Sequence, residues 1–375
     1  MSVKTLKRFT KVLLVTCNII VAVFLFIGCY GSEFDAEKYW YTGLFTLTTF
    51  YILLLLGVFA IFWIFVKKTL VFISITAVIL CWSKLKEVIP FHFGHNFVIA
   101  KKPARIRVMS WNVEHFDILE HRSHPERKQE MIAMINEYEP DIACFQEMVA
   151  SDRFPAAINY LPDFVSKLNM YDYHYAYNPK LDFDNKHHFG IIIFSKYPIV
   201  NKETIAYAPK DYNSIFQYID ILKGRDTIRI FNIHLQSLKF SNNNLKYIET
   251  PSINDETDIQ ESKSVIAKLR IGFLKRKKQS ERIRKAIDES PYPAIVCGDF
   301  NDVPNSYAYN FIGKGMNNAF AEKGTGIGRT FYSISPTLRI DNIFADTRFE
   351  TEQYVRIKKK LSDHFPIVAD LLFQQ

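Results

Sequence analysis

Apolar residues gather in three long runs near the N-terminus, and the runs become short after residue 104. Val12 to Tyr30 is an uncharged run of 19 residues, which as a helix would reach ~28 Å against a hydrocarbon core of ~30 Å. Leu44 to Val66 gives 23 residues without a charge, and Trp40 and Trp63 stand where aromatic side chains favour a membrane interface. Both runs predict membrane-spanning helices. The first could also be a signal peptide, but it is longer than a usual signal and a second run follows.

The third apolar run, Thr69 to Trp82, has only 14 residues, a length that also suits a re-entrant or interfacial helix. It spans if the helix continues to Ile89 while Lys84 and Lys86 extend to the interface. We expect it to span, because its apolar side chains are costly to leave in water. The predicted spans are therefore 12–30, 44–66 and 69–89 in a membrane region of residues 1–90, with a linker at 91–103.

Charges flanking the spans predict the orientation of the chain. The N-terminus and Lys67-Lys68 are basic, whereas Glu33, Asp35 and Glu37 lie between the first two spans. Basic segments prefer the cytoplasm, so we expect a cytoplasmic N-terminus. Three spans would place residues 104–375 outside the cytoplasm and two would place them inside, and the lysines between 84 and 102 favour the second arrangement. We expect the first.

Beyond residue 104, short apolar runs alternate with amphipathic helical segments. Arg105 to Trp111 alternates polar and apolar residues as a half-buried strand does. Amphipathic helices are predicted after Pro125 and over 259–289, and the polar stretch 241–261 is expected to be a surface loop. Several strands read as hairpins, so we expect an α/β fold with a mixed sheet or pair of sheets and helices outside. Further predicted strands cover 141–145, 189–194, 215–222, 227–233, 294–297, 339–344, 354–357 and 366–373.

The net charge of +8 is not spread evenly along the chain. Residues 1–102 contain 11 Lys and Arg against 4 Asp and Glu, which leaves 36 against 35 for residues 103–375. The C-terminal domain is therefore nearly neutral, and its charge does not favour nucleic acid as a partner. The five cysteines follow no disulfide pattern.

Polar side chains lie at or next to one end of several predicted strands. After the buried strand 294–297, Gly298 permits a turn, and Asp299 and Asn301 then point to one face. Carboxylates and amides at the mouth of a sheet suit metal or phosphate chemistry. The other strands supply Trp111-Asn112, Gln146-Glu147, Asn232-Ile233-His234, Arg339-Ile340-Asp341 and Ser362-Asp363-His364.

Taken in order, these motifs resemble the endonuclease/exonuclease/phosphatase superfamily, which has the deoxyribonuclease I-like fold, here in a membrane-anchored form of the bacterial type. The resemblance covers residues 104 to 375 and therefore implies a catalytic domain there. It implies a four-layer sandwich of two mixed β-sheets flanked by helices, preceded by the transmembrane helices. It also implies a site where strand ends from both sheets meet.

Oxygen ligands are what a hard divalent cation requires, and Glu147 is the best single candidate. Asn112 and either Asp299 or Asp363 would complete a site for Mg²⁺, with Mn²⁺ as a substitute. The resemblance implies that Asp299 holds or deprotonates the attacking water and that Asn301 orients the water or the phosphate. It further implies that His364 donates to a phosphoryl oxygen, that Asp341 fixes the His364 ring, and that His234 binds phosphate.

The sequence leaves two assignments open. The general base is either Asp299 or the Asp341/His364 pair. His188 falls close to the site in members of the family, whereas His115, His121, His124, His174 and His187 match no motif and are expected at the surface.

We therefore expect a membrane-anchored, Mg²⁺-dependent phosphoesterase that uses a metal-activated water. The near-neutral domain and the membrane helices favour a lipid or another small phosphodiester. The alternatives are an endonuclease acting on DNA or RNA and a non-catalytic scaffold that retains the fold. The sequence does not indicate the oligomeric state.

Overall fold

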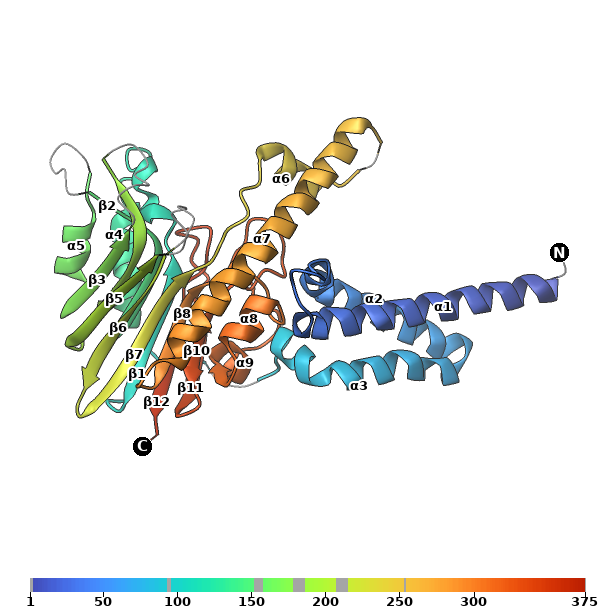
Figure 1. The fold of residues 1–375 in the computed structure, drawn as a ribbon, viewed down its shortest axis with the longest axis horizontal. Coiled ribbons are helices and arrows are strands. Elements are labelled where there is room, and N and C mark those ends of the chain that lie inside the picture. Colours follow the sequence, from blue (N-terminus) through green and yellow to red (C-terminus); the bar gives the residue numbers. More distant parts are fainter. Residues whose placement is uncertain are drawn as a thin grey trace.

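A bundle of long helices and an α/β domain lie end to end in the computed structural model of this chain (Figure 1). The structure describes residues 3–92, 96–151, 158–177, 186–206, 215–252 and 254–374. The bundle contains α1 (Val3–Tyr30), α2 (Thr42–Val66) and α3 (Val71–Val88). The N-terminus and the turn between α2 and α3 lie at the end of the bundle remote from the α/β domain (Figure 1).

All three bundle helices are long and apolar enough to cross a membrane. The third apolar run was short enough for a re-entrant helix. In the structure, α3 is one continuous helix of 18 residues, about 27 Å long. Inside the bundle each helix contributes one polar side chain to a buried cluster. Asn18 Nδ2 donates to Ser74 Oγ at 3.1 Å, and Trp63 Nε1 donates to Asn18 Oδ1 at 3.1 Å. These hydrogen bonds fix the three helices against one another.

The α/β domain is built on two six-stranded mixed sheets. The first sheet has the order β11-β12-β1-β2-β4-β3 and the second the order β5-β6-β7-β8-β10-β9. In each sheet one central pair is parallel, β1 with β2 and β7 with β8, and the other described pairs are antiparallel. The strands are β1 (Arg105–Asn112), β2 (Ile142–Ala150), β3 (Asp172–Tyr177), β4 (His188–Ser195), β5 (Ile199–Ala206), β6 (Ile215–Lys223), β7 (Asp226–His234), β8 (Ala294–Asp299), β9 (Met316–Asn318), β10 (Asp341–Asp346), β11 (Phe349–Arg356) and β12 (Ile367–Phe373).

Helices cover the outer face of each sheet, so the domain has the expected four layers. Met131 and Ile135 of one helix pack on the first sheet, and Ile283 and Ile287 of another pack on the second. Between the sheets lies a separate apolar core that includes Cys144 and Cys297. The helices are α4 (Arg127–Tyr138), α5 (Leu161–Lys167), α6 (Asn242–Glu249), α7 (Glu256–Asp288), α8 (Tyr307–Ile312) and α9 (Ala319–Lys323).

The stretch 241–261 is not a surface loop, as its polar composition had suggested. It contains α6 and the first turns of α7. Ser241 accepts a hydrogen bond from the Asn244 backbone, and the Asn244 side chain accepts one from the Ser241 backbone, which is a capping box. Asp255 caps α7 in a similar way. Residues 241–274, called the α6–α7 arm below, project beyond the sheets on the side of the helical bundle (Figure 1).

The helical bundle packs directly on the α/β domain. The buried Arg339 guanidinium donates to the carbonyl oxygens of Glu87 and Val88 at the end of α3. Nearby, Tyr309 Oη donates to Glu87 Oε2 at 2.9 Å and Asn305 Nδ2 donates to the Lys84 carbonyl at 3.1 Å. These contacts hold the end of α3 to the domain independently of the predicted linker.

The described part of that linker also packs on the domain. The His92 ring nitrogen lies 2.8 Å from the Ala321 carbonyl oxygen, and the Val98 backbone donates to Gln353 Oε1 at 3.0 Å. The bundle and the domain are therefore joined at several points.

Replacing Arg339 by Ala should lower the melting temperature of the detergent-purified chain by about 5 °C or more. The substitution leaves buried carbonyl acceptors without a donor, at about 1–3 kcal/mol each, and a domain of this size loses about 2–4 °C per kcal/mol. Arg348→Ala is the matched control, because Arg348 is exposed and pairs with Asp346 on the surface. Equal shifts in the two variants, followed by intrinsic fluorescence on heating, would contradict this account of the junction.

Candidate active site

Strand pairing brings the polar ends of distant strands to one edge of the sandwich. The parallel pairs place Asn112 beside Gln146 in the first sheet and His234 beside Asp299 in the second. β10 runs antiparallel to β8, so its first residue, Asp341, is also paired with Asp299. Five strands thus contribute to one cluster.

Gln146 and Asn232 connect the two sheets behind this cluster. Gln146 Nε2 donates to Asn232 Oδ1 at 2.7 Å, and Asn232 Nδ2 donates to the carbonyl oxygens of Phe145 and Ile192 at 3.0 and 2.9 Å. Both side chains are fully buried. Their role is structural, because they set the distance between the two sheets at the edge where the cluster lies.

Glu147 reaches the cluster through a bulge in β2. The register with β4 shifts between Phe145 and Met148, and Glu147 has a φ of 56°. Asn112 Nδ2 donates to Glu147 Oε1 and to Asp299 Oδ2, each at 3.2 Å. Burial would raise the pKa of Glu147, but the neighbouring His234 and His115 together with this amide lower the pKa below its ordinary value.

Asp299 is almost completely buried at the end of β8. Its Oδ1 accepts a hydrogen bond from the Asn301 backbone at 2.7 Å. Burial, opposed by His364 and assisted by Asp341, raises the pKa of Asp299 to about 6. The preceding Gly298 has a φ of 149°, and a Cβ there would collide with the Ile233 carbonyl oxygen. Only glycine therefore allows the strand to end in this way.

Asn301 follows Asp299 in a left-handed conformation, with a φ of 50°. Its side-chain amide donates to the Leu235 carbonyl oxygen at 3.0 Å. This bond fixes the side chain beside the cluster.

His364 and Asp341 form a buried ion pair across the two sheets. His364 Nδ1 lies 2.8 Å from Asp341 Oδ2, and Trp111 Nε1 donates to the His364 carbonyl oxygen at 3.0 Å. Burial alone would lower the pKa of His364, but Asp341 and Asp299 raise it well above its ordinary value. The other ring nitrogen, Nε2, lies 3.8 Å from Asp299 Oδ2.

The remaining predicted residues lie in the same place. His234 Nε2 is 3.5 Å from Asp299 Oδ2 and 3.7 Å from Glu147 Oε1. Asp363 Oδ1 is 3.9 Å from His364 Nε2, and the Asp363 side chain is 35% exposed. The structure therefore brings together every residue that the sequence predicted for the site.

His115 also lies at the site. The prediction that His115 is a surface residue was wrong. Its Nε2 is 3.4 Å from Glu147 Oε2, and its ring packs edge-on against Phe189. Residues 114–117 all have positive φ values, and this turn folds the chain back over the end of β1. Glu114, which follows the Asn112 motif, accepts a hydrogen bond from the Asp363 backbone at 2.9 Å. The proximity of both residues to the Asn112 motif was the only signal in the sequence.

His188, which the sequence left open, begins β4, where its ring stacks on Tyr177 with 4.4 Å between ring centres. Of the histidines expected at the surface, His124 is 45% exposed and lies beside Asp117. His188 and His124 thus each contact a nearby side chain outside the cluster.

Oxygen atoms dominate the donor set that could hold a metal ion. The ligand atoms of Asp299, Asp341 and His364 lie within 4.8 Å of one another. However, Asp341 Oδ2 and His364 Nδ1 already bond to each other, and all three residues are almost completely buried. Glu147 and Asp363 instead have partly exposed side chains, which suits a cation that retains water ligands. Glu147, Asp363 and Asp299 offer carboxylate oxygens of the kind that a hard divalent cation prefers. Asn112 would join them by turning its amide oxygen toward them.

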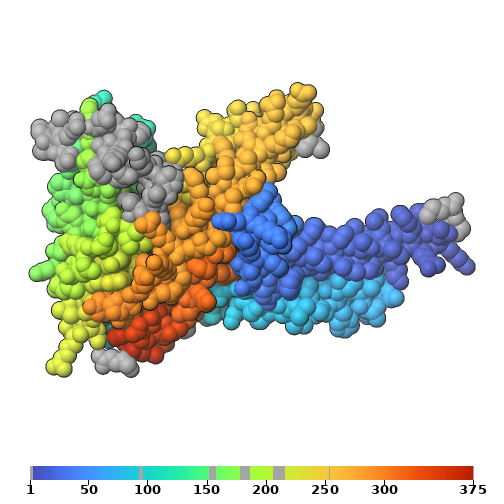
Figure 2. All heavy atoms as spheres, viewed as in Figure 1, coloured from blue at the N-terminus to red at the C-terminus, as the bar shows by residue number. Residues whose placement is uncertain are grey.

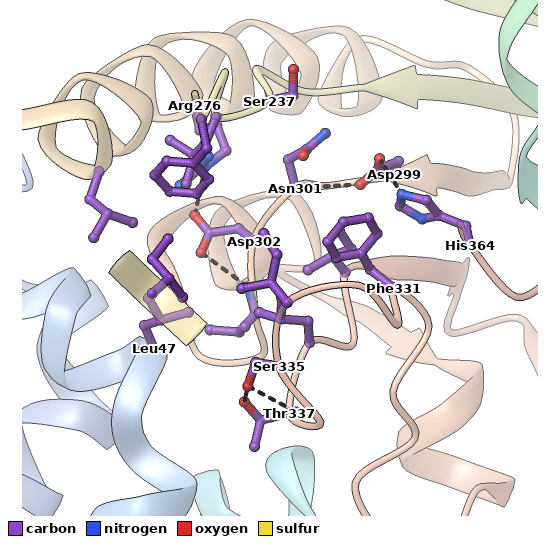
Figure 3. Close-up of a pocket in the computed structure, with 18 of the residues that line it drawn as sticks. Leu47, Ser237, Arg276, Asp299, Asn301, Asp302, Phe331, Ser335, Thr337 and His364 are labelled. Atoms are coloured by element: carbon purple, nitrogen blue, oxygen red, sulfur yellow. Dashed lines mark hydrogen bonds and ion pairs between the residues drawn. The ribbon is translucent and has the colours of Figure 1, made fainter. Parts of the chain in front are cut away.

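The site forms one end of a cavity of about 410 Å³. Asn112, Glu147, Asp299, Asn301, Asp363 and His364 line this end. In the close-up, Asp299 and His364 lie on one side of the cavity and Leu47 of α2 on the other (Figure 3). Between them the lining is largely apolar, and it includes Phe331, Ile334, Leu338 and Val303.

Two family models match parts of this chain. Residues 109–364 match the Endonuclease/Exonuclease/phosphatase family, and residues 10–88 match a domain of unknown function. The comparison with curated proteins gave no match.

Solved structures show the same fold. A family protein from Bacteroides thetaiotaomicron is 19% identical over 73% of this chain and 100% of its own, with a TM-score of 0.52. An endonuclease/exonuclease/phosphatase from Beutenbergia cavernae DSM 12333 is 17% identical over 72% of each chain, with a TM-score of 0.51. D. rerio TDP2 complexed with a single-strand DNA product is 16% identical over 71% of this chain and 98% of its own, with a TM-score of 0.50. Since the family match spans most of the sequence, the chain belongs to the Endonuclease/Exonuclease/phosphatase family and is a metal-dependent phosphoester hydrolase.

Proposed function

We propose that this chain is a membrane-anchored, Mg²⁺-dependent phosphodiesterase whose substrate carries its phosphodiester on a lipid or another small amphiphile. One observation carries the proposal: the cavity that contains Asp299 and His364 is completed by Leu47, Thr48 and Tyr51 of α2, the helix whose residues Thr49–Val66 are a candidate membrane span. A phosphate bound among the polar residues would therefore have hydrocarbon directed toward the membrane helices.

Glu147, Asp363 and Asp299, with Asn112, would hold the cation. A divalent cation bound there supplies charge that stabilises phosphoryl oxygens and lowers the pKa of a bound water. The donor set contains carboxylate and amide oxygens, which are the ligands that Mg²⁺ prefers.

The other residues would act on the proton and on the phosphoryl group. His364 is held in its charged form by Asp341, so its Nε2 can donate to a phosphoryl oxygen. His234 lies between Asp299 and Glu147, where it can contact the same group. Asp299 is the better general base of the two candidates, because the Asp341/His364 pair is already bonded internally. Water attacks phosphorus, its proton passes to Asp299, and the bond to the leaving oxygen breaks.

A nucleic-acid phosphodiester is the second candidate. D. rerio TDP2, which has the same fold, was solved with a single-strand DNA product, and this supports nucleic acid as an alternative substrate class. The near-balance of 36 basic and 35 acidic residues in residues 103–375 argues against it, since channels for single strands are positively charged. A non-catalytic scaffold is disfavoured because every side chain proposed for catalysis and cation binding is present in the cluster.

We infer that the catalytic domain lies outside the cytoplasm. The acidic loop between α1 and α2 contacts the domain end of the molecule: Lys84 Nζ lies 3.5 Å from Glu33, and Asn310 Nδ2 donates to Ser32 Oγ at 2.6 Å. The basic turn at Lys67-Lys68 is at the opposite end of α2. Placing that turn in the cytoplasm directs the domain to the other side.

EDTA should abolish hydrolysis of phosphodiesters by the full-length chain in detergent micelles, and Mg²⁺ or Mn²⁺ should restore it, because the candidate donors are almost all oxygens. A panel of lipid, nucleotide and simple alkyl phosphodiesters, assayed with and without Mg²⁺, measures this and ranks the substrate classes. Full activity in excess chelator would contradict the assignment of a metal-dependent reaction.

Asp299→Asn and His364→Ala should each lower kcat by ~100-fold or more, as expected for groups that act in the transition state. His364→Ala should also lower the melting temperature, because it leaves Asp341 buried without its positive partner. Asp346→Asn and His124→Ala are matched controls outside the site and should retain wild-type turnover. Near wild-type turnover in either site variant would remove that residue from the mechanism.

A reporter that is active only outside the cytoplasm should be active when it is fused after Phe373 of the full chain. Deleting residues 69–89 removes one crossing and should silence it. A silent full-length fusion, together with an active cytoplasmic reporter at the same position, would place the domain and its substrate in the cytoplasm.

A further inference from the structure

Two apolar walls of different origin enclose the outer part of the catalytic cavity. One wall is α2, through Leu47 and Tyr51. The other is the α6–α7 arm with the segment that leads into it, through Phe240, Ile248, Val265 and Leu269. In the space-filling view the arm and the bundle diverge from a common base and leave an open notch between them (Figure 2). We call the space between these walls the slot.

The base of the slot is closed by direct contacts between α7 and the start of α2. A Cβ on Gly43 would lie 2.8 Å from Phe273 Cε2, so the two helices touch there. The Arg270 guanidinium lies over the Trp40 ring at 5.5 Å. Beyond these contacts the arm separates from the bundle (Figure 1). The two walls therefore meet at Gly43 and Phe273 and separate beyond this contact (Figure 1).

The charged groups along the slot neutralise each other. Arg276, buried beside the cavity, donates from Nε to Asp302 Oδ2 at 3.0 Å and from Nη1 to the Gln236 carbonyl at 3.0 Å. The outer lining is otherwise apolar or hydroxylic among the described residues. A nucleic-acid strand would place further phosphates here, where the described lining offers them no free cation. A hydrocarbon chain meets no such penalty.

The apolar surface continues from the slot into the membrane region. Leu54 and Val58 of α2 are exposed to 53% and 62%, and Ile266 of the arm is exposed to 43%. Exposed apolar surface of this extent on both sides of an opening marks contact with lipid rather than with water. The volume of about 410 Å³ is at the lower end of ligand pockets, which are about 300–1,000 Å³, so the rest of a membrane lipid would remain in the bilayer.

From these observations we infer that the slot is a lateral entrance for one hydrocarbon chain of a membrane lipid, and that α2 and the α6–α7 arm select the substrate by that chain. The inference rests on the proposed function, since it needs the phosphodiester at Asp299 and His364. It assigns the membrane helix a part in specificity as well as in anchoring.

Alkyl p-nitrophenyl phosphodiesters with methyl, octyl or hexadecyl chains test the slot, because the scissile bond is the same in all three. With Mg²⁺ and the full chain in non-ionic micelles, kcat/KM should rise with chain length. Leu47→Trp and Leu269→Trp fill the slot from opposite walls, and each should lower the hexadecyl-to-methyl ratio of kcat/KM about tenfold or more. Tenfold equals about 1.4 kcal/mol, or about two buried methylenes.

Ratios within one variant cancel any loss of folded enzyme. Ile79→Trp is the matched control, since Ile79 is an exposed residue of α3 outside the cavity lining, and its ratio should equal that of the wild type. Hydrolysis of all three esters with a ratio that neither slot variant changes would overturn the lateral entrance while leaving the phosphodiesterase intact.

A second measurement does not depend on turnover. p-Benzoylphenylalanine in place of Leu269 should cross-link to radiolabelled phospholipid when the full chain is in vesicles and illuminated. The same photoprobe in place of Val200, an exposed residue of β5, should give little cross-linked lipid. Lipid cross-linking at 269 without hydrolysis of any ester would support the slot and contradict the proposed reaction. A cross-link from 269 to a second copy of this chain instead of lipid would overturn the slot.

Discussion

The ion pair between Asp341 and His364 is the interaction on which the site depends. Asp341 begins a strand of the second sheet, whereas His364 precedes a strand of the first. Burying Asp341 next to Asp299 would be costly without a positive partner, because like charges repel strongly where water is excluded. His364 supplies that charge, and Asn112 links Asp299 back to the first sheet. The cluster can therefore form only when both sheets are packed together, so the fold and the site stabilise each other.

The same strand connects the site to the helical bundle. Arg339 lies two residues before Asp341, and its guanidinium binds carbonyl groups at the end of α3. The start of β10 is thus held at Arg339 by the bundle and at Asp341 by His364. On the other side of the site, Tyr51 of α2 hydrogen-bonds to Ser335 at 3.1 Å. The bundle is accordingly a wall of the catalytic cavity as well as an extension of the domain.

Much of this architecture could be predicted from the sequence, because it rests on local patterns. Apolar runs that end on Asn112, Asp299 or His234 identify buried strands and the side chains at their ends. Other features depend on tertiary packing or on backbone conformations that local patterns do not encode. The left-handed turn at 114–117 brought His115 to Glu147, and a capping box formed α6 in a stretch of asparagines. Leu47 and Leu269 line one cavity only because two helices distant in sequence dock at Gly43 and Phe273.

The proposed reaction is hydrolysis of a lipid phosphodiester at Asp299 and His364. Mass spectrometry of lipids from membranes that contain either the wild-type chain or the Asp299→Asn variant tests this reaction. One phosphodiester lipid should be depleted, and its two hydrolysis products should accumulate, only with the wild type and Mg²⁺. Identical lipid profiles for the two chains, with DNA or RNA cleaved by the wild type alone, would contradict it.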